Sequence, residues 1–281
     1  MKKATPEYSI KALCELFEAS VSTYYHQIRP RSVNKEEVRL IVAIKGIAQK
    51  TENTYGKRRM QPELLKQGFV LGLHRTSRLM KKAGVVAITQ KKKHYYADAG
   101  KAHHKAENLL ARQFNPGTVN THWVGDITYI RTHQGWSYLA CVLDLGSKEI
   151  VGWSMSKQPN AQLAKTALSH ALGRHKPDTS KLLFHSDQGV QYSSALFTEY
   201  LEALGITQSM SRRGNCWDNA VMERFFRSLK SERLNHLQFI NHASAVNSVE
   251  RYIGFYNNQR LHSAIGYITP VQKTQAMKKV A

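Results

Sequence analysis

The sequence predicts an α/β fold in which a mixed-sheet domain is preceded by small all-α modules. Three observations predict it. Up to about residue 90, apolar residues recur at helical spacing between short turns. After residue 118, strand-like runs and helical segments follow in the order β-β-β-α-β-α-β-α, which favours a mixed sheet flanked by helices. Finally, 42% of the 281 residues are hydrophobic, which is enough for packed cores.

Residues 1–31 are expected to form a first helix-turn-helix. Apolar spacing predicts one helix from about Ile10 to Phe17, and Ser20 or Ser22 can cap a second short helix. A structural helical hairpin is the alternative, because the turn lacks the usual glycine.

Residues 32–90 are expected to form a second helix-turn-helix. A longer helix starts near Glu36, and shorter helices are predicted over 61–67 and 74–83, with glycines as stops. The apolar side of the longer helix is read as Val38, Ile41, Val42, Ile44 and Ile47.

Basic residues of this second module are candidate DNA contacts. Arg58 and Arg59 lie in a basic turn, and Arg75 and Arg78 open the last helix, a position that suits phosphate and groove contact. The alternative is a solvated face in which Arg58 or Arg59 pairs with Glu63.

Residues 91–118 read as a basic linker that tracks DNA, because they show no periodicity. Lys91, Lys92 and Lys93 are its candidate DNA contacts. The pair at 103–104 consists of histidines without partners at ligand spacing, which favours solvated side chains over a zinc site.

Residues 119–235 are expected to form the α/β domain, whose first three strands have the short connections of an antiparallel meander. The predicted elements are strands over 121–132, 136–145, 149–156, 182–189 and 206–209 and helices over 160–173, 194–204 and 218–234.

Residues 236–281 are expected to add a helix over 242–258 and an irregular tail. In this tail Asn258, Arg260 and His262 could reach the active site or DNA, or serve a purely structural role.

The charge of the chain predicts a polyanionic partner. Residues 1–114 hold 23 Lys and Arg against 9 Asp and Glu, a net +14, and residues 115–281 hold 18 against 11, a net +7. Nucleic acid is the default partner for such an excess, and a basic but unrelated enzyme is the alternative. Three scattered cysteines fit a reducing cytoplasm, and neither a signal peptide nor a membrane-spanning run is found.

Three acids lie in apolar surroundings, where a charge is costly unless it is used or paired. Asp126 sits inside the run WVGDITYI, Asp187 ends the run LLFHSD, and Glu223 lies among apolar helix residues. If the first strand is central and the fourth is its neighbour, the three carboxylates can converge. The other acids discussed for this half are expected to be exposed: Asp144, Glu149, Asp178, Glu199, Glu202, Glu232 and Glu250.

Three converging carboxylates repel one another, which raises their pKa values unless a cation neutralises them. Hard oxygen ligands with few histidines favour Mg²⁺, with Mn²⁺ as a substitute, over zinc. Two such ions about 3.5–4 Å apart would activate an attacking oxygen and stabilise the leaving one in phosphodiester displacement.

Two cations follow Glu223 on its helix. Arg227 and Lys230 lie four and seven residues further on, and seven residues at about 100° each return to within roughly 20° of the same face. Both are candidate phosphate contacts, and an ordinary i,i+4 pair between Glu223 and Arg227 is the alternative.

Two further polar residues lie near these acids. His185 is expected to share a strand face with Asp187, where it could contact substrate or water or serve a structural role. Asp218 is expected to cap the helix of Glu223.

This pattern resembles the DDE transposases of bacterial insertion sequences, which are related to retroviral integrases. In this sequence 35 residues separate Asp187 from Glu223, and Lys230 follows Glu223 by seven. The segments that carry the resemblance are WVGDITYI, HSDQGVQYSS, SRRGNCWDNAVMERFFRSLKSE and YNNQRLHSAIGYITP, preceded by YGKRRMQPELLKQGF and HRTSRLMKKAGVVA, which look like the integrase-associated helix-turn-helix. The match covers roughly residues 8–275 and points to the larger, catalytic open reading frame product of the frameshifting family.

The resemblance implies an RNase H-like core in which Asp126, Asp187 and Glu223 are the catalytic residues and hold two Mg²⁺ ions. It implies cleavage of DNA at terminal inverted repeats, followed by attack of the freed 3′-hydroxyl on another phosphodiester. The histidines and cysteines of the retroviral zinc domain are absent, so no zinc is expected. Glu18 stands where the family's first helix-turn-helix usually has glycine.

The implied partners are double-stranded DNA, both terminal repeat and target, and further copies of the chain. Synapsis of two ends needs at least a dimer on DNA, and the upstream-frame protein is another candidate partner. The implied setting is the bacterial cytoplasm, at the nucleoid. A non-catalytic DNA-binding regulator of transposition and an RNase H-like nuclease without strand transfer are the competing functions.

Overall fold

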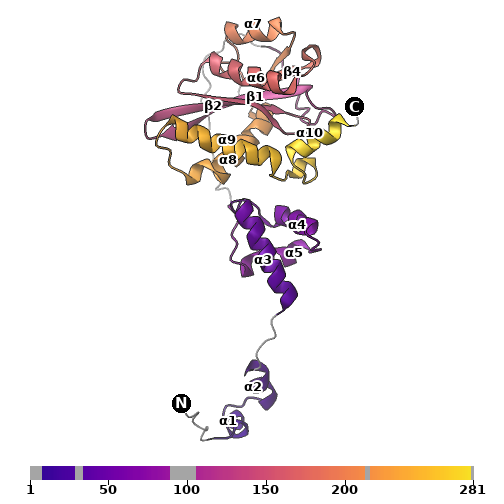
Figure 1. Cartoon of the computed structure of the whole chain (residues 1–281), viewed down its shortest axis with the longest axis vertical. Helices are drawn as coiled ribbons and strands as arrows, with labels where there is room; N and C mark the ends of the chain where they lie inside the picture. The colour runs from indigo at the N-terminus through magenta and orange to yellow at the C-terminus, as the bar shows by residue number, and fades with distance from the viewer. Residues whose placement is uncertain (1–7, 29–33, 89–105, 213–215, 280–281) are drawn as a thin grey trace.

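The computed structural model describes residues 8–28, 34–88, 106–212 and 216–279. Along the chain it shows two helical modules followed by an α/β domain (Figure 1). None of the described helices is long and apolar enough to cross a membrane.

The first module consists of α1 (Ile10–Leu16) and α2 (Val21–Ile28), as predicted. The Ser20 hydroxyl accepts a hydrogen bond from the Thr23 N–H at 3.0 Å and thereby caps α2. Glu18 takes the left-handed conformation, with φ of 50°, in the turn between the helices. This is the position at which glycine would avoid strain, so Glu18 adopts the backbone that the turn requires at some energetic cost.

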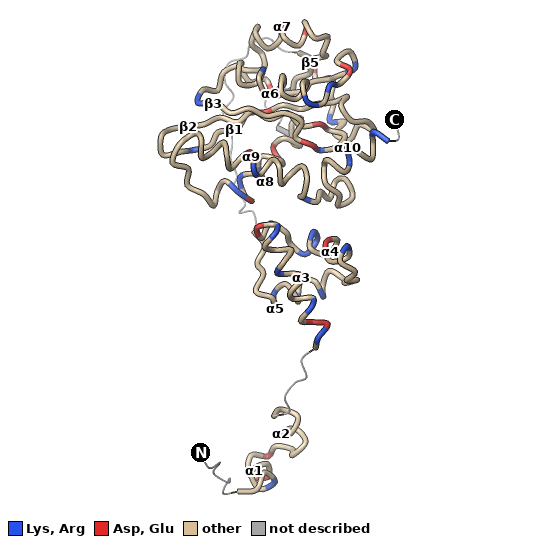
Figure 2. The backbone as a smooth tube through the Cα atoms, in the orientation of Figure 1, with Lys and Arg blue, Asp and Glu red and all other residues tan. Residues whose placement is uncertain are grey.

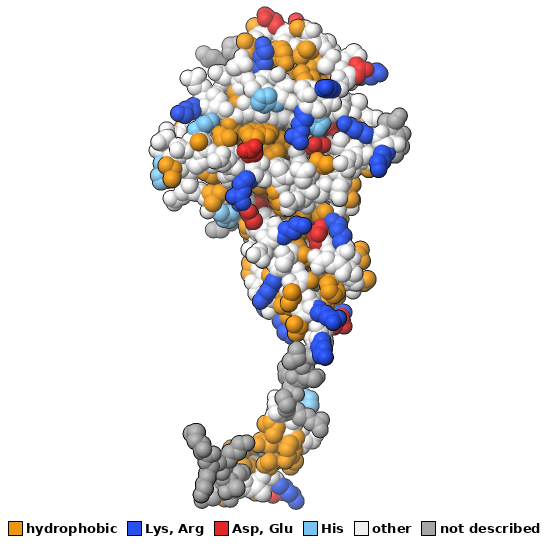
Figure 3. Space-filling view, in the orientation of Figure 1, with side chains coloured by type: hydrophobic (Ala, Val, Ile, Leu, Met, Phe, Trp, Pro, Cys, Tyr) orange, Lys and Arg blue, Asp and Glu red, His pale blue; other side chains and the backbone are white. Residues whose placement is uncertain are grey.

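Much of the apolar surface of the first module is uncovered. Leu16 and Phe17 are each 74% exposed, and Cys14 is the only buried residue of α1 and α2. Figure 3 shows hydrophobic side chains gathered over these two helices. Within residues 8–28, therefore, the two helices bury too little apolar area to form a core of their own.

The second module packs α3 (Lys35–Lys50), α4 (Lys57–Lys66) and α5 (Leu73–Lys82) around a small core. Its buried residues include Leu40, Ile44, Ile47, Met60, Leu64 and Leu79.

Two details of the second module differ from the expectation. Val38 and Val42 are exposed, because the buried stripe of α3 runs through Leu40 and Ile44. Helix α4 begins at Lys57 rather than 61, so the expected basic turn is its first turn.

The α/β domain is built on a five-stranded mixed sheet of order β3-β2-β1-β4-β5. The first three strands form the predicted antiparallel meander, and β4 and β5 run parallel to the central β1. The strands are β1 (His122–Thr132), β2 (Gly135–Asp144), β3 (Ile150–Ser156), β4 (Leu183–Ser186) and β5 (Thr207–Met210). This topology confirms the expected RNase H-like mixed-sheet fold.

Helices cover both faces of the sheet (Figure 1). One face packs on α6 (Ala161–His175) and α7 (Ala195–Ala203), and the other on α8 (Ala220–Glu232) and α9 (His242–Asn258). Helix α6 approaches β3 so closely that a Cβ on Gly152 would lie 2.3 Å from a backbone oxygen of α6, so this position requires glycine.

The segment after α9 is more ordered than an irregular tail. Helix α10 (Pro270–Lys278) begins with a capping box between Thr269 and Gln272, and Pro270 occupies the first helical turn. Short 3-10 turns at Thr179–Lys181, Cys216–Asn219, Leu234–His236 and Ser263–Ile265 complete the fold.

Three acids expected on the surface are buried. Asp144 accepts hydrogen bonds from the Ser147 N–H and hydroxyl and from the Asn120 N–H. Glu149 accepts a hydrogen bond from Thr274 of α10. The third acid, Glu232, has partners from several segments that lie far apart in the sequence. Glu149 and Glu232 are buried because groups far away in the sequence satisfy their oxygens, whereas the partners of Asp144 include Ser147 in the same turn.

The second module contacts the α/β domain directly. The Tyr55 hydroxyl donates to the Gln259 carbonyl oxygen at 2.9 Å and accepts from the Leu261 N–H at 2.8 Å. Leu261 itself is fully buried in the core of the second module. The segment after α9 therefore forms a joint between the two parts.

A buried ion pair lies beside this joint. The Arg260 guanidinium donates to both carboxylate oxygens of Glu232, at 2.6 and 2.8 Å, while the Tyr252 hydroxyl donates at 2.8 Å. Arg59 of α4 lies 3.4 Å from the same carboxylate. Arg260 is 3% exposed, and His262 bonds the Tyr256 hydroxyl at 3.0 Å. Both tail residues thus take the structural role rather than lining the predicted active site.

Candidate active site

Asp126 lies near the middle of the central strand β1. Its side chain is partly buried, and one oxygen accepts a hydrogen bond from the Ile127 N–H at 2.7 Å. The residue before it must be glycine, because a Cβ on Gly125 would lie 2.5 Å from the Phe184 ring of β4. Close packing of β4 against β1 therefore fixes the backbone that carries Asp126.

Asp187 follows directly after β4, which pairs in parallel with β1. The register places Val124 opposite His185, so a continuation by two residues places Asp126 opposite Asp187. The Asp187 carboxylate is exposed and accepts a hydrogen bond from the Gly189 N–H at 3.0 Å, which holds the turn after the strand. The paired part of the two strands ends two residues before these acids, so the direction of the strands carries both toward the same end of the sheet.

Glu223 lies in the first turn of α8. Its neighbours Met222 and Phe225 are buried against the sheet, while Glu223 itself is exposed. Just before the helix, the Asn219 side-chain amide donates to the Gly125 carbonyl oxygen at 3.4 Å. This contact ties the start of α8 to the strand position next to Asp126.

The three carboxylates interact electrostatically. Burial raises the pKa of Asp126 well above its usual value, and the charges of Asp187 and Glu223 raise it further. Partial desolvation also raises the pKa of Asp187 and of Glu223, although both side chains reach solvent. Three acids from distant parts of the sequence are thus linked through Asp126, on which the charges of the other two act.

Lys230 and Arg227 lie beyond Glu223 on α8. The positive charge of Lys230 opposes the rise in the pKa of Asp126, and that of Arg227 opposes the rise in the pKa of Glu223. No ion pair joins Glu223 to Arg227 among the described residues. The acid Glu223 and the base Arg227 therefore lie on the same helix without pairing with each other in the described chain.

The donor set suits a hard divalent cation. In the described part of the chain, no group of three or more His, Cys, Asp or Glu side chains is arranged to hold a metal ion as it stands. The carboxylates of Asp126, Asp187 and Glu223 nevertheless repel one another, and bringing a cation between them would relieve this repulsion. All their donor atoms are oxygens, which Mg²⁺ and Mn²⁺ prefer.

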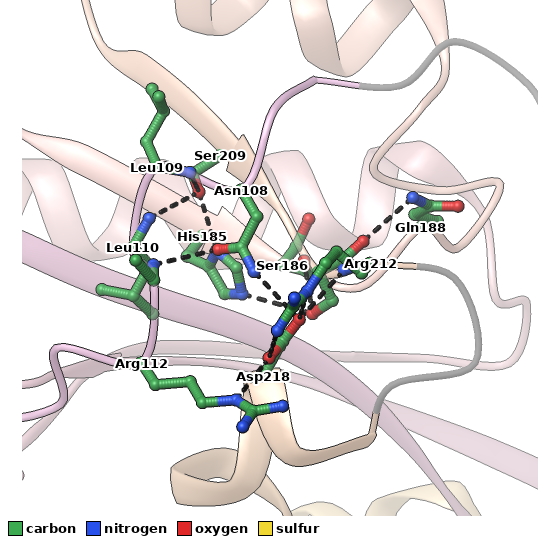
Figure 4. A network of polar contacts seen from close by, with 12 residues as sticks. Asn108, Leu109, Leu110, Arg112, His185, Ser186, Gln188, Ser209, Arg212 and Asp218 are labelled. Carbon is green, nitrogen blue, oxygen red and sulfur yellow. Dashed lines mark hydrogen bonds and ion pairs between the residues drawn. The ribbon is translucent and has the colours of Figure 1, made fainter.

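A buried polar network anchors the entry to α8 (Figure 4). Asp218, 1% exposed, accepts hydrogen bonds from Arg112 at 2.8 Å, from Asn108 at 2.9 Å and from Arg212 at 3.2 Å. Although burial opposes its charge, the hydrogen bonds from Arg212 and Arg112 hold the pKa of Asp218 well below its usual range. The network joins the segment before β1 and the segment after β5 to the helix of Glu223.

Asp218 is therefore not the N-cap of α8, as had been expected. It lies in the 3-10 turn Cys216–Asn219, and Asn219 occupies the N-cap position without a side-chain cap bond. The contacts of Arg112 and Arg212 with Asp218 were not predicted, because only the fold brings these residues together.

Replacing Asp218 by Asn is expected to lower the free energy of unfolding by about 1–3 kcal/mol at pH 7, because two guanidinium groups lose a charged acceptor. The folded-state pKa is depressed, so the stabilisation is present above the unfolded pKa of about 3.9 and is lost as the pH falls further. Urea unfolding at several pH values would measure this. The exposed Glu199→Gln is the control, and a difference from wild type that persists unchanged below pH 3 would contradict the prediction.

His185 is fully buried, and its ring nitrogens bond the Ser209 and Ser211 hydroxyls at 2.9 and 3.2 Å. Burial lowers the pKa of His185 to about 4. His185 and Asp187 were expected to share a strand face, but β4 ends at Ser186 and the regular alternation of side chains ends with it. The His185 ring is therefore buried in the interior, whereas Asp187 is exposed. This geometry favours the structural alternative over substrate contact.

The candidate DNA contacts of the second module separate into two groups. Arg58 and Arg78 are exposed, on the first turn of α4 and on α5. Arg75 is also on α5 and pairs with Glu36 at 3.0 Å. Figure 2 shows basic residues along all three helices of the module.

Arg59 differs, because it points at Glu232 of the α/β domain, and this favours a structural role. The alternative, a pairing of Arg58 or Arg59 with Glu63, is not found among the described residues, where Glu63 pairs with Lys66 at 2.7 Å. Lys91, Lys92, Lys93 and the histidines at 103–104 lie outside the described residues.

Three segments of the chain match known protein families. Residues 117–216 and 204–270 each match a family described as integrase core domain, and residues 35–93 match an HTH-like domain.

Several relatives are similar over most of their length. An uncharacterised 31 kDa protein of insertion element IS600 from Shigella sonnei is 38% identical over 264 residues, covering 92% of this chain and 96% of that protein. Transposase InsF for insertion sequence IS3A from Escherichia coli (strain K12) is 36% identical over 279 residues, covering 97% and 96%. The transposase for IS904 from Lactococcus lactis subsp. lactis (strain IL1403) is 35% identical over 243 residues, covering 86% and 96%.

Solved structures with some likeness include the HTLV-2 integrase catalytic core domain in complex with magnesium. It is 18% identical, covers 56% of this chain and 97% of its own, and has a TM-score of 0.45. A chain of the simian T-cell lymphotropic virus intasome is 16% identical, covers 82% of this chain and 74% of its own, and has a TM-score of 0.48.

Proposed function

Because the chain belongs to the insertion-sequence transposases with an integrase core, we propose that it binds the terminal inverted repeats of its element, cleaves DNA there and joins the freed 3′-hydroxyl to a second phosphodiester. The observation that carries this proposal is the meeting of Asp126, Asp187 and Glu223, whose charges act on one another across β1, β4 and α8. Among the described residues, no ion pair neutralises any of these three acids.

The three carboxylates would hold Mg²⁺, or Mn²⁺ in its place. When bound, the metal activates the attacking oxygen and stabilises the charge on the leaving oxygen, and two ions would serve both ends of an in-line displacement. The chain's own contribution is orientation: Gly125 and Asn219 fix β1 and the start of α8 against each other, so that the acids are held on rigid elements.

Lys230 and Arg227 would bind the phosphates on either side of the reacting bond. Burial lowers the pKa of Lys230 and the charge of Asp126 raises it. A lysine near that carboxylate, on the helix of Glu223, would hold the DNA backbone within reach of all three acids. Its contact is sequence-independent, because a phosphate carries no base information.

End recognition would belong to the helical modules, with catalysis in residues 119–235. Exposed Arg58, Arg75 and Arg78 on α4 and α5 are suited to phosphate and groove contact. The HTH-like match over residues 35–93 supports this division. Pairing of two DNA ends would require at least two copies of the chain.

The test is a joining assay with the purified chain, duplex DNA that ends in the terminal repeat, a target duplex and Mg²⁺. We expect joined products that require a 3′-hydroxyl, since a 3′-deoxy end cannot attack. Specific binding without cleavage would indicate a regulator, and cleavage without joining would indicate a nuclease. Either result would overturn the proposal.

A further inference from the structure

Two exposed aromatic rings lie together on the β1–β2 hairpin. Tyr129 and Trp136 are each 48% exposed, and their ring centroids are 5.3 Å apart in an edge-to-face arrangement at 86°. Neither ring belongs to the hydrophobic clusters on the two faces of the sheet. A large exposed aromatic pair with no part in the core indicates a binding surface.

Each ring also has a cation beside it. The Lys230 ammonium lies 4.7 Å from the Tyr129 ring centroid, and the Arg131 guanidinium lies 5.9 Å from that of Trp136. We name Tyr129, Arg131, Trp136 and Lys230 the aromatic ledge. Rings that present π faces next to positive charges are suited to a ligand that is both aromatic and anionic.

The aromatic ledge adjoins the three acids. Tyr129 follows Asp126 by three residues on β1, so the two side chains leave opposite faces of the strand at positions about 10 Å apart along it. Lys230 connects the two places, because its charge acts on Asp126 while its ammonium lies over Tyr129. Strand β4 pairs with β1 only over His122–Val124, so no strand of the described chain pairs with that edge of β1 beyond Val124.

On the basis of the proposed function, we propose that the aromatic ledge binds one or two unpaired nucleotides of the DNA strand, next to the phosphate that reacts. Bases would stack on Tyr129 and Trp136, and their phosphates would contact Lys230 and Arg131. Stacking tolerates any base, because every base has a π face. A fully paired duplex keeps its bases stacked inside, so the occupant is a single-stranded or locally opened end.

Leucine substitutions test this inference, since leucine keeps apolar bulk but removes the ring. In joining assays with ends that carry two unpaired nucleotides, Tyr129→Leu and Trp136→Leu are each expected to lower the apparent affinity about 5- to 150-fold, the range for loss of one stacked base. Tyr200→Leu is the matched control, because Tyr200 lies on α7 with Lys165 at 4.7 Å from its ring and takes no part in the aromatic ledge.

An abasic substrate separates stacking from a structural effect. If the unpaired nucleotides lack bases, wild type should fall to the level of the leucine variants, and these variants should lose no more. Equal losses by the variants on normal and abasic ends would contradict the proposal, because the rings would then act without a base.

A binding measurement distinguishes failure of this inference from failure of the proposed function. Titration with a single-stranded oligothymidylate should quench the fluorescence that wild type has and Trp136→Phe lacks, whereas a blunt duplex should not. If the protein joins no DNA but its fluorescence is quenched, the proposed strand transfer is refuted and the binding of bases by the aromatic ledge is supported. Absence of quenching would overturn the aromatic ledge whatever the joining activity.

Discussion

Replacing Asp126 by Asn is expected to lower both cleavage and joining by about a thousandfold or more, while binding to the terminal repeat is unchanged. The reason is that the carboxylate would be lost as a metal ligand, and metal stabilisation of a transition state is worth several kcal/mol. Asp187→Asn and Glu223→Gln should behave alike, because the three acids act as one site. Folding should not suffer, since each change removes a charge that its neighbours repel.

The measurement is joining of labelled ends with Mg²⁺, alongside a gel-shift assay for binding. Asp178→Asn is the control, because Asp178 is exposed, caps the 3-10 turn after α6 and pairs with Lys181 rather than with the acids. A chelator should abolish joining by wild type and leave its DNA binding intact. Near-wild-type joining by all three variants would show that the chemistry lies elsewhere.

Replacing Glu232 by Ala is expected to lower the free energy of unfolding by about 3–5 kcal/mol. The substitution leaves the guanidinium of Arg260 buried without its partner and removes an acceptor from Arg59 and Tyr252. Loss of Glu232 should also weaken the contact between the second module and the α/β domain, because Arg59 belongs to α4.

Urea unfolding would measure the loss. Glu250→Ala on the exposed side of α9 is the control and should change stability by no more than about 0.5 kcal/mol. A double variant, Glu232→Leu with Arg260→Leu, should recover much of the stability, since apolar replacement of a buried pair is often neutral. A cost below about 1 kcal/mol for Glu232→Ala would mean that water reaches the guanidinium.

The sequence predicted the layer architecture well because its signals are local. Alternating apolar residues mark β1 and β2, and the short connections between the first three strands permit only an antiparallel meander. The acids Asp126 and Asp187 stood out because each interrupts or ends an apolar run. Their adjacency then followed from the placing of β1 and β4 as neighbours.

What the sequence could not predict depends on partners far away in the chain. Glu149 and Glu232 looked like surface acids, but their burial is decided by donors from other segments. For Glu232 these include Arg260, 28 residues on, and Arg59, 173 residues before it. Helix α4 also begins four residues earlier than predicted, and it accommodates Pro62 in its second turn.

Helix α8 carries Glu223 near one end and Glu232 at the other, and the joint to the second module lies at the Glu232 end. Nine residues of helix span about 13.5 Å, close to the rise of four base pairs of DNA. If the second module recognises the DNA sequence, its attachment to the rigid helix α8 fixes the distance between the recognised sequence and the acids. The number of base pairs between the sequence that is read and the bond that is cut would then be set by the protein, and DNA ends with added or missing base pairs would be out of register.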